Sequence, residues 1–354
     1  MKKSLYFAMF AAVALASCSS NDAIEEIVED EVAIDFEGLT NKSTRAEIAD
    51  EAALATAGGF AVFGEKHKTD LEFTAWNNTN GTVIFNNVNV TGSKSGSATD
   101  YTWTYSGTKY WDKTATYNFY AIAPYEASPK YTPDANGKFT ITDVASNLAA
   151  DSKDYVIDRD GVTNVSGATY AAGKTPVAFD FHHIMAKVDF KANATVDNVV
   201  IKKITMSGWD KNTGTFVQTT IADDKKADSG TWNELNCSEW TLATTETTKG
   251  SYDVYENSTG TSLTKNTAVA IGNTYIMVPQ VITANTLKFT IDYTVGGEPF
   301  TAQEGLVTTA QTWGTDSHTT YTINVGPEAI TFDVTSVCDF CVPGTANDPN
   351  ATVN

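Results

Sequence analysis

Hydrophobic and polar residues alternate in many short segments along this chain. Residues 32–37, for example, read Val-Ala-Ile-Asp-Phe-Glu. A period of two predicts β-strands with one buried face, and the Gly, Asn, Ser, Thr and Pro clusters between the segments are typical of turns. The pattern predicts strands at residues 32–37, 59–64, 83–90, 101–105, 117–123, 138–142, 177–181, 187–192, 199–206, 215–221, 274–278, 287–295, 321–325 and 330–334.

Helical periodicity is almost absent. Residues 46–56 are rich in Ala and Glu and predict one short helix. Many short strands joined by polar loops favour an all-β fold made of β-sandwiches. The strand at residues 177–181 runs through His182 and His183 into a new alternating strand, so a domain boundary is predicted near residue 184.

The first eighteen residues resemble the signal peptide of a bacterial lipoprotein. Lys2 and Lys3 precede an apolar run over residues 5–15, which is too short to span a bilayer. The run ends in Leu-Ala-Ser-Cys18, similar to the lipobox whose cysteine receives diacylglycerol. Residues 19–31 are acidic and predict a tether, and two or three acyl chains would anchor it stably. An ordinary secretory signal with a chance cysteine is the alternative.

The charged residues argue against one class of partner and limit where an arginine-specific protease could cut. The 354 residues include 43 acidic and 24 basic ones, for a net charge of −19. Such a surface repels phosphate, which argues against a nucleic-acid partner. The only two arginines are Arg45 and Arg159, so an arginine-specific protease would find few sites.

The sequence contains few motifs that would indicate catalysis or ligand binding. It contains no GxSxG, HExxH, P-loop or dinucleotide-binding motif, so no catalytic, cofactor-binding or metal-binding residues are predicted. Cys338 and Cys341 have CxxC spacing without a second pair or a surrounding βαβ pattern; a local disulfide stays open, with Cys237 then unpaired. Residues 158–161 look like part of a calcium loop but lack its later oxygen ligands, which predicts an acidic turn.

Two aromatic features have competing interpretations. Neighbours on a strand point to opposite faces, so His182 and His183 are predicted to be one buried and one exposed rather than joint metal ligands. The tryptophans are interpreted mainly as core residues, with a sugar-stacking platform as the alternative. They are Trp76, Trp103, Trp111, Trp209, Trp232, Trp240 and Trp313.

Several segments together resemble the fimbrillin family of Bacteroidales, the subunits of lipoprotein-derived pili that include the Mfa-like group. Besides the lipobox, they are the strand around Phe36 followed by Ser-Thr-Arg45-Ala46, the aromatic strand 118–125 ending in Pro-Tyr, the junction 179–188, the run 275–280 into Pro-Gln, and the closing strands 321–325 and 330–332. They span almost the whole chain in the family's order. The doubled histidine and the polar tail over residues 343–354 depart from the family pattern.

The resemblance implies a lipoprotein signal peptide at 1–17, a tether and removable strand at 18–45, and transthyretin-like β-sandwich domains at 46–184 and 185–354. It implies a structural subunit of a pilus on the bacterial outer membrane, lipidated at Cys18 and without enzymatic activity, with adhesion as a further role. Its partners would be other pilus subunits, in a homopolymer or a heteropolymer. Cleavage between Arg45 and Ala46 would remove the first strand, and a neighbouring subunit would supply a replacement. Candidate donor residues are Ile330, Phe332 and Val334; Val337 breaks their parity. A non-polymerising surface lipoprotein that binds glycan is the alternative.

Overall fold

Strands form nearly all of the regular structure, as the alternation predicts. The computed structural model describes residues 31–40, 50–68, 81–94, 101–148, 153–209, 212–219, 237–244 and 250–338. The elements belong to one unit that begins at Val32. Among the described residues, no helix is both long and apolar enough to cross a membrane.

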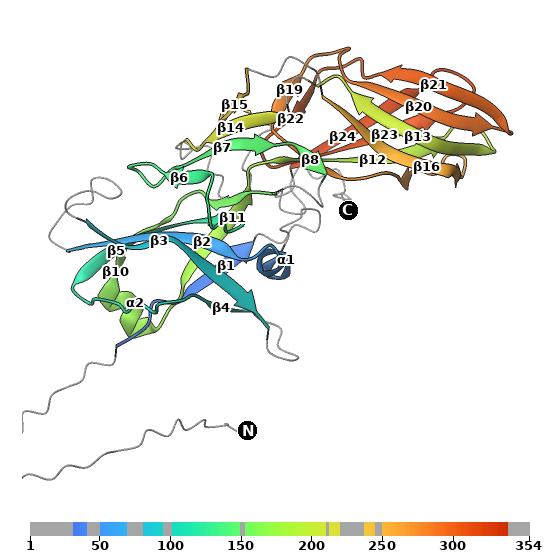
Figure 1. Ribbon diagram of the computed structural model, residues 1–354. Coiled ribbons are helices and arrows are strands. Elements are labelled where there is room, and N and C mark those ends of the chain that lie inside the picture. The colour runs from blue at the N-terminus through green and yellow to red at the C-terminus, as the bar shows by residue number, and fades with distance from the viewer. Residues whose placement is uncertain are drawn as a thin grey trace, which may run out of the picture. The chain divides into compact units, whose positions relative to one another are not determined.

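The largest sheet has eight strands and contains the N-terminal strand at its edge (Figure 1). Its order is β1 (Phe36–Thr40), β11 (Val177–His183), β9 (Val156–Asp158), β5 (Ala115–Ala123), β2 (Phe60–Lys68), β3 (Gly81–Ser93) and β4 (Thr102–Thr104), with β10 (Val162–Ser166) paired to β5. The two helices are α1 (Glu51–Thr56) and α2 (Gly167–Gly173).

Both faces of this sheet are buried at its centre. In β2, Phe60 and Val62 join one hydrophobic cluster, whereas Ala61 and Phe63 join another. A strand that is covered on both sides reads as a continuous apolar run rather than an alternating one. This explains the uninterrupted apolar stretches at residues 60–63 and 119–123.

A four-stranded sheet contributes to the second of these clusters. Its order is β15 (Trp240–Leu242), β14 (Thr213–Val217), β7 (Phe139–Ala145) and β6 (Tyr131–Pro133). The sheet draws strands from both sides of residue 184, because β14 pairs with β7. The division into ranges 46–184 and 185–354 therefore stays a prediction.

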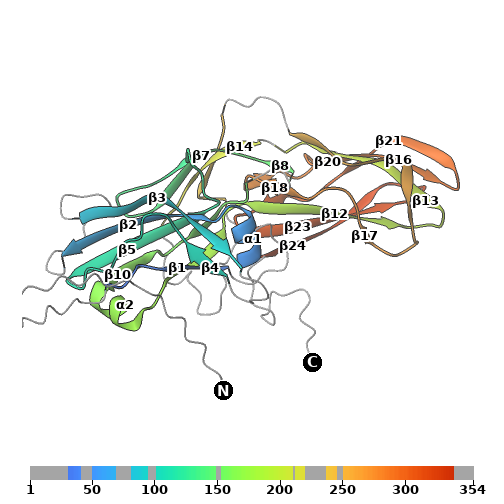
Figure 2. The same ribbon diagram turned by 60° about the horizontal axis from the view of Figure 1, so that its bottom comes forward.

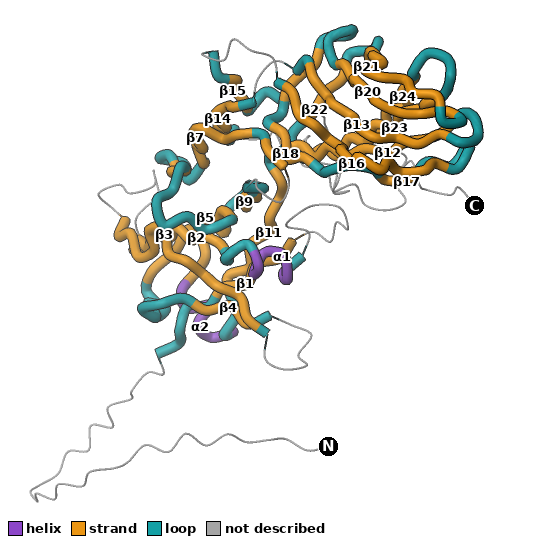
Figure 3. The backbone as a smooth tube through the Cα atoms, turned by 45° about the vertical axis from the view of Figure 1, so that its right-hand side comes forward, coloured by secondary structure: helices purple, strands orange, loops and turns teal. Residues whose placement is uncertain are grey.

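The C-terminal strands form two layers around a third cluster (Figure 3). One layer is β24 (Thr331–Cys338), β23 (Ser317–Val325), β12 (Ala186–Ala194), β18 (Tyr275–Met277) and β8 (Asn147–Leu148), with β17 (Val269–Ala270) paired to β12. The other is β16 (Ser251–Leu263), β13 (Val199–Ser207), β20 (Lys288–Val295) and β21 (Glu298–Leu306), and a separate pair is β19 (Gln280–Ile282) and β22 (Gln311–Trp313). Alternate residues of β12 enter the cluster, as its sequence predicts.

The sequence pattern did not predict two long strands and one helix. β16 and β21 are the edge strands of their sheet, and most of their side chains are exposed or only partly buried, so they carry little apolar alternation. Helix α2 is also unpredicted. The helix expected over residues 46–56 appears as α1 from Glu51, and residues 46–49 lie outside the described part.

Candidate functional site

The first strand and the residues just before it place two side chains in an aromatic pocket. Ile34 is fully buried and Phe36 is 4% exposed, whereas Asp35 between them is exposed. The alternation predicted for residues 32–37 is therefore confirmed, although the regular strand lies slightly later. Ring centroids lie 5.1 to 5.9 Å from that of Phe36 in four residues: Phe85, Tyr105, Phe119 and Phe179.

Backbone hydrogen bonds hold this segment on two sides. β1 runs parallel to β11, and Val177 N–H donates to the carbonyl oxygen of Asp35 at 2.8 Å. On the other side, Ile34 N–H donates to the carbonyl oxygen of Lys109 at 2.8 Å. The Tyr105 hydroxyl donates to the carbonyl oxygen of Ile34, also at 2.8 Å. Without this segment, these partners would lack their hydrogen bonds.

Gly38 marks the closest approach of β1 to the rest of the pocket. A Cβ atom at this position would lie 2.8 Å from Leu54 Cδ2 and 3.0 Å from Phe60 Cε1. Leu54 belongs to α1, which lies beside β1 (Figures 1 and 2). Helix α1, which follows the predicted cleavage position in the sequence, therefore contributes to the pocket that holds β1.

Three of the predicted site residues cannot be placed. Cys18, Arg45 and Ala46 lie outside the described residues. Lipidation and cleavage therefore remain predictions from sequence.

The other arginine is placed, and it is inaccessible. Arg159 is 6% exposed, and its Nη1 atom donates to both carboxylate oxygens of Glu239, at 2.9 and 3.1 Å. Gln218 Nε2 and Lys138 Nζ donate to the Arg159 carbonyl oxygen at 2.8 and 2.9 Å. A protease must bind an extended, accessible backbone, so the folded protein protects Arg159.

The predicted donor residues Phe332 and Val334 lie on the last described strand, and Ile330 comes directly before it. β24 is the edge strand of its sheet and pairs antiparallel with β23. Ile330, Phe332 and Val334 are partly buried against the C-terminal cluster, whereas Thr331 and Asp333 are exposed. The predicted shared face is confirmed. The side chain of Val337 lies outside the described part.

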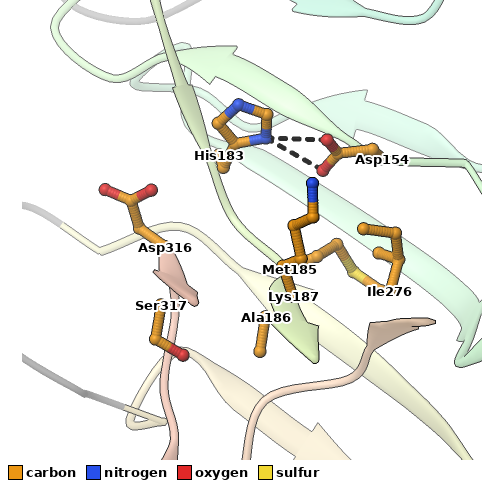
Figure 4. Close-up of a pocket in the computed structure, with 8 residues that line it drawn as sticks. All are labelled: Asp154, His183, Met185, Ala186, Lys187, Ile276, Asp316 and Ser317. Carbon is orange, nitrogen blue, oxygen red and sulfur yellow. Dashed lines mark hydrogen bonds and ion pairs between the residues drawn. The ribbon is translucent and has the colours of Figure 1, made fainter. Parts of the chain in front are cut away.

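The prediction for the two histidines is wrong. His182 and His183 are 6% and 5% exposed, so both are buried. The prediction assumed a solvent face, but β11 is an interior strand that leads directly into β12, and protein covers both of its faces here. His183 Nδ1 lies 2.9 Å from the carboxylate of Asp154 (Figure 4).

The pocket beside His183 is too small for an organic ligand. Asp154, His183, Lys187 and Asp316 line a cavity of about 10 Å³ (Figure 4). That volume holds about one water molecule. Among the described residues, no group of three or more His, Cys, Asp or Glu side chains is arranged to hold a metal ion.

The segment that resembles a calcium loop forms a turn, as predicted. Asp158 Oδ1 accepts hydrogen bonds from the N–H groups of Asp160 at 3.2 Å and Gly161 at 3.0 Å. The pKa of the Asp158 carboxyl is raised to about 7, mainly because the group is buried; the two N–H donors oppose this shift, and the nearby charges of Asp180 and Asp160 add to it.

This shift predicts how stability depends on pH. Between an unfolded pKa near 3.8 and a folded pKa of about 7, the folded state binds more protons at Asp158, so the free energy of unfolding falls as pH rises. Asp158→Asn keeps the accepting oxygen but has no charge to bury. We expect its stability relative to the wild type to rise by about 4 kcal/mol from pH 4 to pH 8 in urea unfolding, because a pKa difference of one between the folded and unfolded states corresponds to about 1.4 kcal/mol. A constant difference across this range would contradict the assignment.

The described tryptophans support the core interpretation. Trp103, Trp111, Trp209, Trp240 and Trp313 are all buried, at 0 to 8% exposed. None of these five offers a face for sugar stacking. Trp76 and Trp232 lie outside the described residues.

The cysteines provide no evidence for redox chemistry. Burial raises the pKa of the free Cys237 thiol to about 11, which leaves little thiolate at neutral pH. The side chains of Cys338 and Cys341 lie outside the described part of the chain. Their pairing remains open.

Comparisons with known proteins agree with this architecture. A sequence profile described as fimbrillin-like matches residues 44–337. A fimbrial protein from Bacteroides vulgatus has a similar solved structure, with 17% identity, a TM-score of 0.58, and coverage of 86% of this chain and 99% of that one. A candidate cell adhesion protein from Bacteroides uniformis has 16% identity, a TM-score of 0.50, and coverage of 88% and 98%.

No curated protein sequence matches significantly. At these identities the solved structures show a shared fold. The sequence profile covers most of the chain, including α1, the junction at His182 and His183, and nearly all of β24. The protein therefore belongs to the fimbrillin-like family.

Proposed function

We propose that this protein is a structural, non-catalytic subunit of a cell-surface pilus, exported as a lipoprotein and assembled by proteolysis and strand exchange. The fimbrillin-like family supports the pilus and the surface location. The observation that carries the assembly mechanism is the position of β1. It is an edge strand whose side chains fill a deep pocket, and the predicted cleavage position follows it in the sequence.

Cleavage after Arg45 would leave β1 attached only by noncovalent contacts. Its loss would expose aromatic rings around the position of Phe36 and would unpair the edge of β11. Exposed apolar surface and an unpaired strand edge both favour the addition of another extended segment. A replacement strand would restore both the hydrogen bonds and the buried contacts.

β24 is the proposed source of this strand. It lies at a sheet edge near the end of the described chain, and its apolar side chains share one face. Each subunit would donate at one end and accept at the other. Such head-to-tail contacts do not close, so they generate a fibre.

The burial of Arg159 supports specific processing. Arg159 is protected by Glu239, and Arg45 is the other of the two arginines in the sequence, so we propose Arg45 as the cleavage position. One cut in a linker would therefore process the folded protein without damaging it.

Protease treatment of two variants tests this function. Residues 18–354 with Cys18→Ser are compared with the same protein carrying Arg45→Ala, both treated with an arginine-specific endoprotease. We expect a single cut before Ala46 and oligomers by size-exclusion chromatography and electron microscopy in the first protein only. Cut protein that remains monomeric and binds polysaccharide would instead support the glycan-binding alternative.

A further inference from the structure

Two distant segments of the chain share three of five residues at the same spacing. Residues 33–37 read Ala-Ile-Asp-Phe-Glu, and residues 329–333 read Ala-Ile-Thr-Phe-Asp. Ala, Ile and Phe recur at the same spacing, and an acidic residue follows each Phe. The first segment leads into β1, which begins at Phe36, and the second leads into β24, which begins at Thr331.

The two segments use this pattern in the same way. Ile34 and Phe36 point into the protein, as Ile330 and Phe332 do in the C-terminal cluster. The side chains between them, Asp35 and Thr331, are both exposed. The shared residues are thus the ones that determine which pocket each strand fits.

Their degree of burial differs. Phe36 is 4% exposed within a cage of four aromatic rings, whereas Phe332 is only partly buried and lies against Phe289 in a tilted arrangement with ring centroids 4.9 Å apart. The same phenylalanine side chain would therefore lose more contact with water in the β1 pocket than it does at its own sheet edge. Burial of apolar surface favours the transfer.

We propose that the strand replacing β1 comes from a second copy of this chain and that its residues 330–334 take the positions of residues 34–38. This inference rests on the proposed strand exchange and adds the identity of the donor and its register. Ile330 then fills the place of Ile34, and Phe332 fills the place of Phe36. The assembly is a homopolymer at this joint.

Backbone hydrogen bonds can be reproduced in this register because they do not depend on the side chain. The N–H group of residue 330 would donate to the Lys109 carbonyl oxygen, as Ile34 N–H does now at 2.8 Å. The carbonyl oxygen of residue 331 would accept from Val177 N–H, as Asp35 does now at 2.8 Å.

Other registers are less favourable. A shift of one residue would turn Thr331 and Asp333 into the pocket, because the side chains of a strand alternate in direction. A shift of two residues toward the C-terminal end of β1 would place Phe332 at Gly38, where even a Cβ lies 2.8 Å from Leu54. In the proposed register the smaller Val334 takes this position, which requires the Leu54 side chain and the Phe60 ring to move aside.

Disulfide trapping between two copies tests the register. Glu37 lies opposite Ala178 in the present pairing, and the proposed register places Asp333 there. One protein carries Ala178→Cys and the other Asp333→Cys, both in the background Cys18→Ser, Cys237→Ser, Cys338→Ser and Cys341→Ser. The two are mixed, cut with an arginine-specific protease and oxidised. Matched donors carry Thr331→Cys or Thr335→Cys, which lie two residues away on the same exposed face.

We expect a cross-linked dimer with Asp333→Cys and much less with either matched donor. Adding Phe332→Ala to the donor should lower its yield about tenfold or more, because the largest buried side chain is lost. A single uncut chain with Glu37→Cys and Ala178→Cys serves as a positive control for the geometry.

The experiment distinguishes a wrong register from the absence of strand exchange. If cut protein forms oligomers but cross-links through Thr331→Cys or Thr335→Cys, or through none of the three donors, the register inference is overturned and the pilus function stands. If cut protein with intact cysteines forms no oligomers at all, strand exchange itself fails.

Discussion

Truncation of Phe36 is expected to release the N-terminal strand. The ring is 4% exposed and lies among four other aromatic rings, so Phe36→Ala would leave a cavity lined by Phe85, Phe119 and Phe179. Truncation of a buried phenylalanine costs about 3–5 kcal/mol. We expect a loss of this size in the free energy of unfolding of uncut protein, measured in urea.

The neighbouring residue provides a matched control. Asp35 lies on the same segment with its side chain exposed, so Asp35→Ala should change stability by no more than about 0.5 kcal/mol. Hydrogen exchange at residues 177–181 reports local release of β1 even where global unfolding does not. Equal effects of the two substitutions would show that the pocket does not hold the strand.

The second large effect is expected at the buried ion pair. Glu239→Ala removes the partner of Arg159 and leaves a buried guanidinium uncompensated. Removing one member of a buried pair costs about 3–5 kcal/mol, and this loss should appear in urea unfolding. The variant should also acquire a new cut after Arg159 with an arginine-specific protease, because the protecting contact is gone.

An exposed ion pair supplies the control for this change. Glu304 pairs with Lys288 at 2.7 Å, with its side chain 59% exposed. Glu304→Ala should therefore alter stability by at most about 1 kcal/mol and create no new cut. If Glu239→Ala behaves in the same way, the burial of Arg159 does not explain selective processing.

The sequence predicted the strands whose side chains alternate between core and solvent. β12 and β20 carry apolar residues at every second position, β23 does so over residues 321–325, and β13 does so on either side of an irregularity between Ile201 and Lys203; all four appear where expected. β16 and β21 do not, because most of their side chains are exposed or only partly buried. A Gly296-Gly297 turn between β20 and β21 was the available signal for the second of these, since two adjacent glycines favour a tight hairpin.

The sequence predicted only part of the candidate site. Alternation was enough to predict the inward faces at Phe36 and Phe332. The protection of Arg159 was not predictable, because its partner Glu239 is 80 residues away in the sequence and no local pattern links the two. The burial of both histidines likewise depends on packing around β11 that no local pattern encodes.

The most direct test of the central claim is the N-terminal residue of this protein in fibres sheared from cells that express it. The account predicts fibres whose subunits begin at Ala46, so that β1 is absent and its pocket is filled by another strand. Surface protein found only as single chains that retain a lipidated Cys18 and an intact β1 would contradict it.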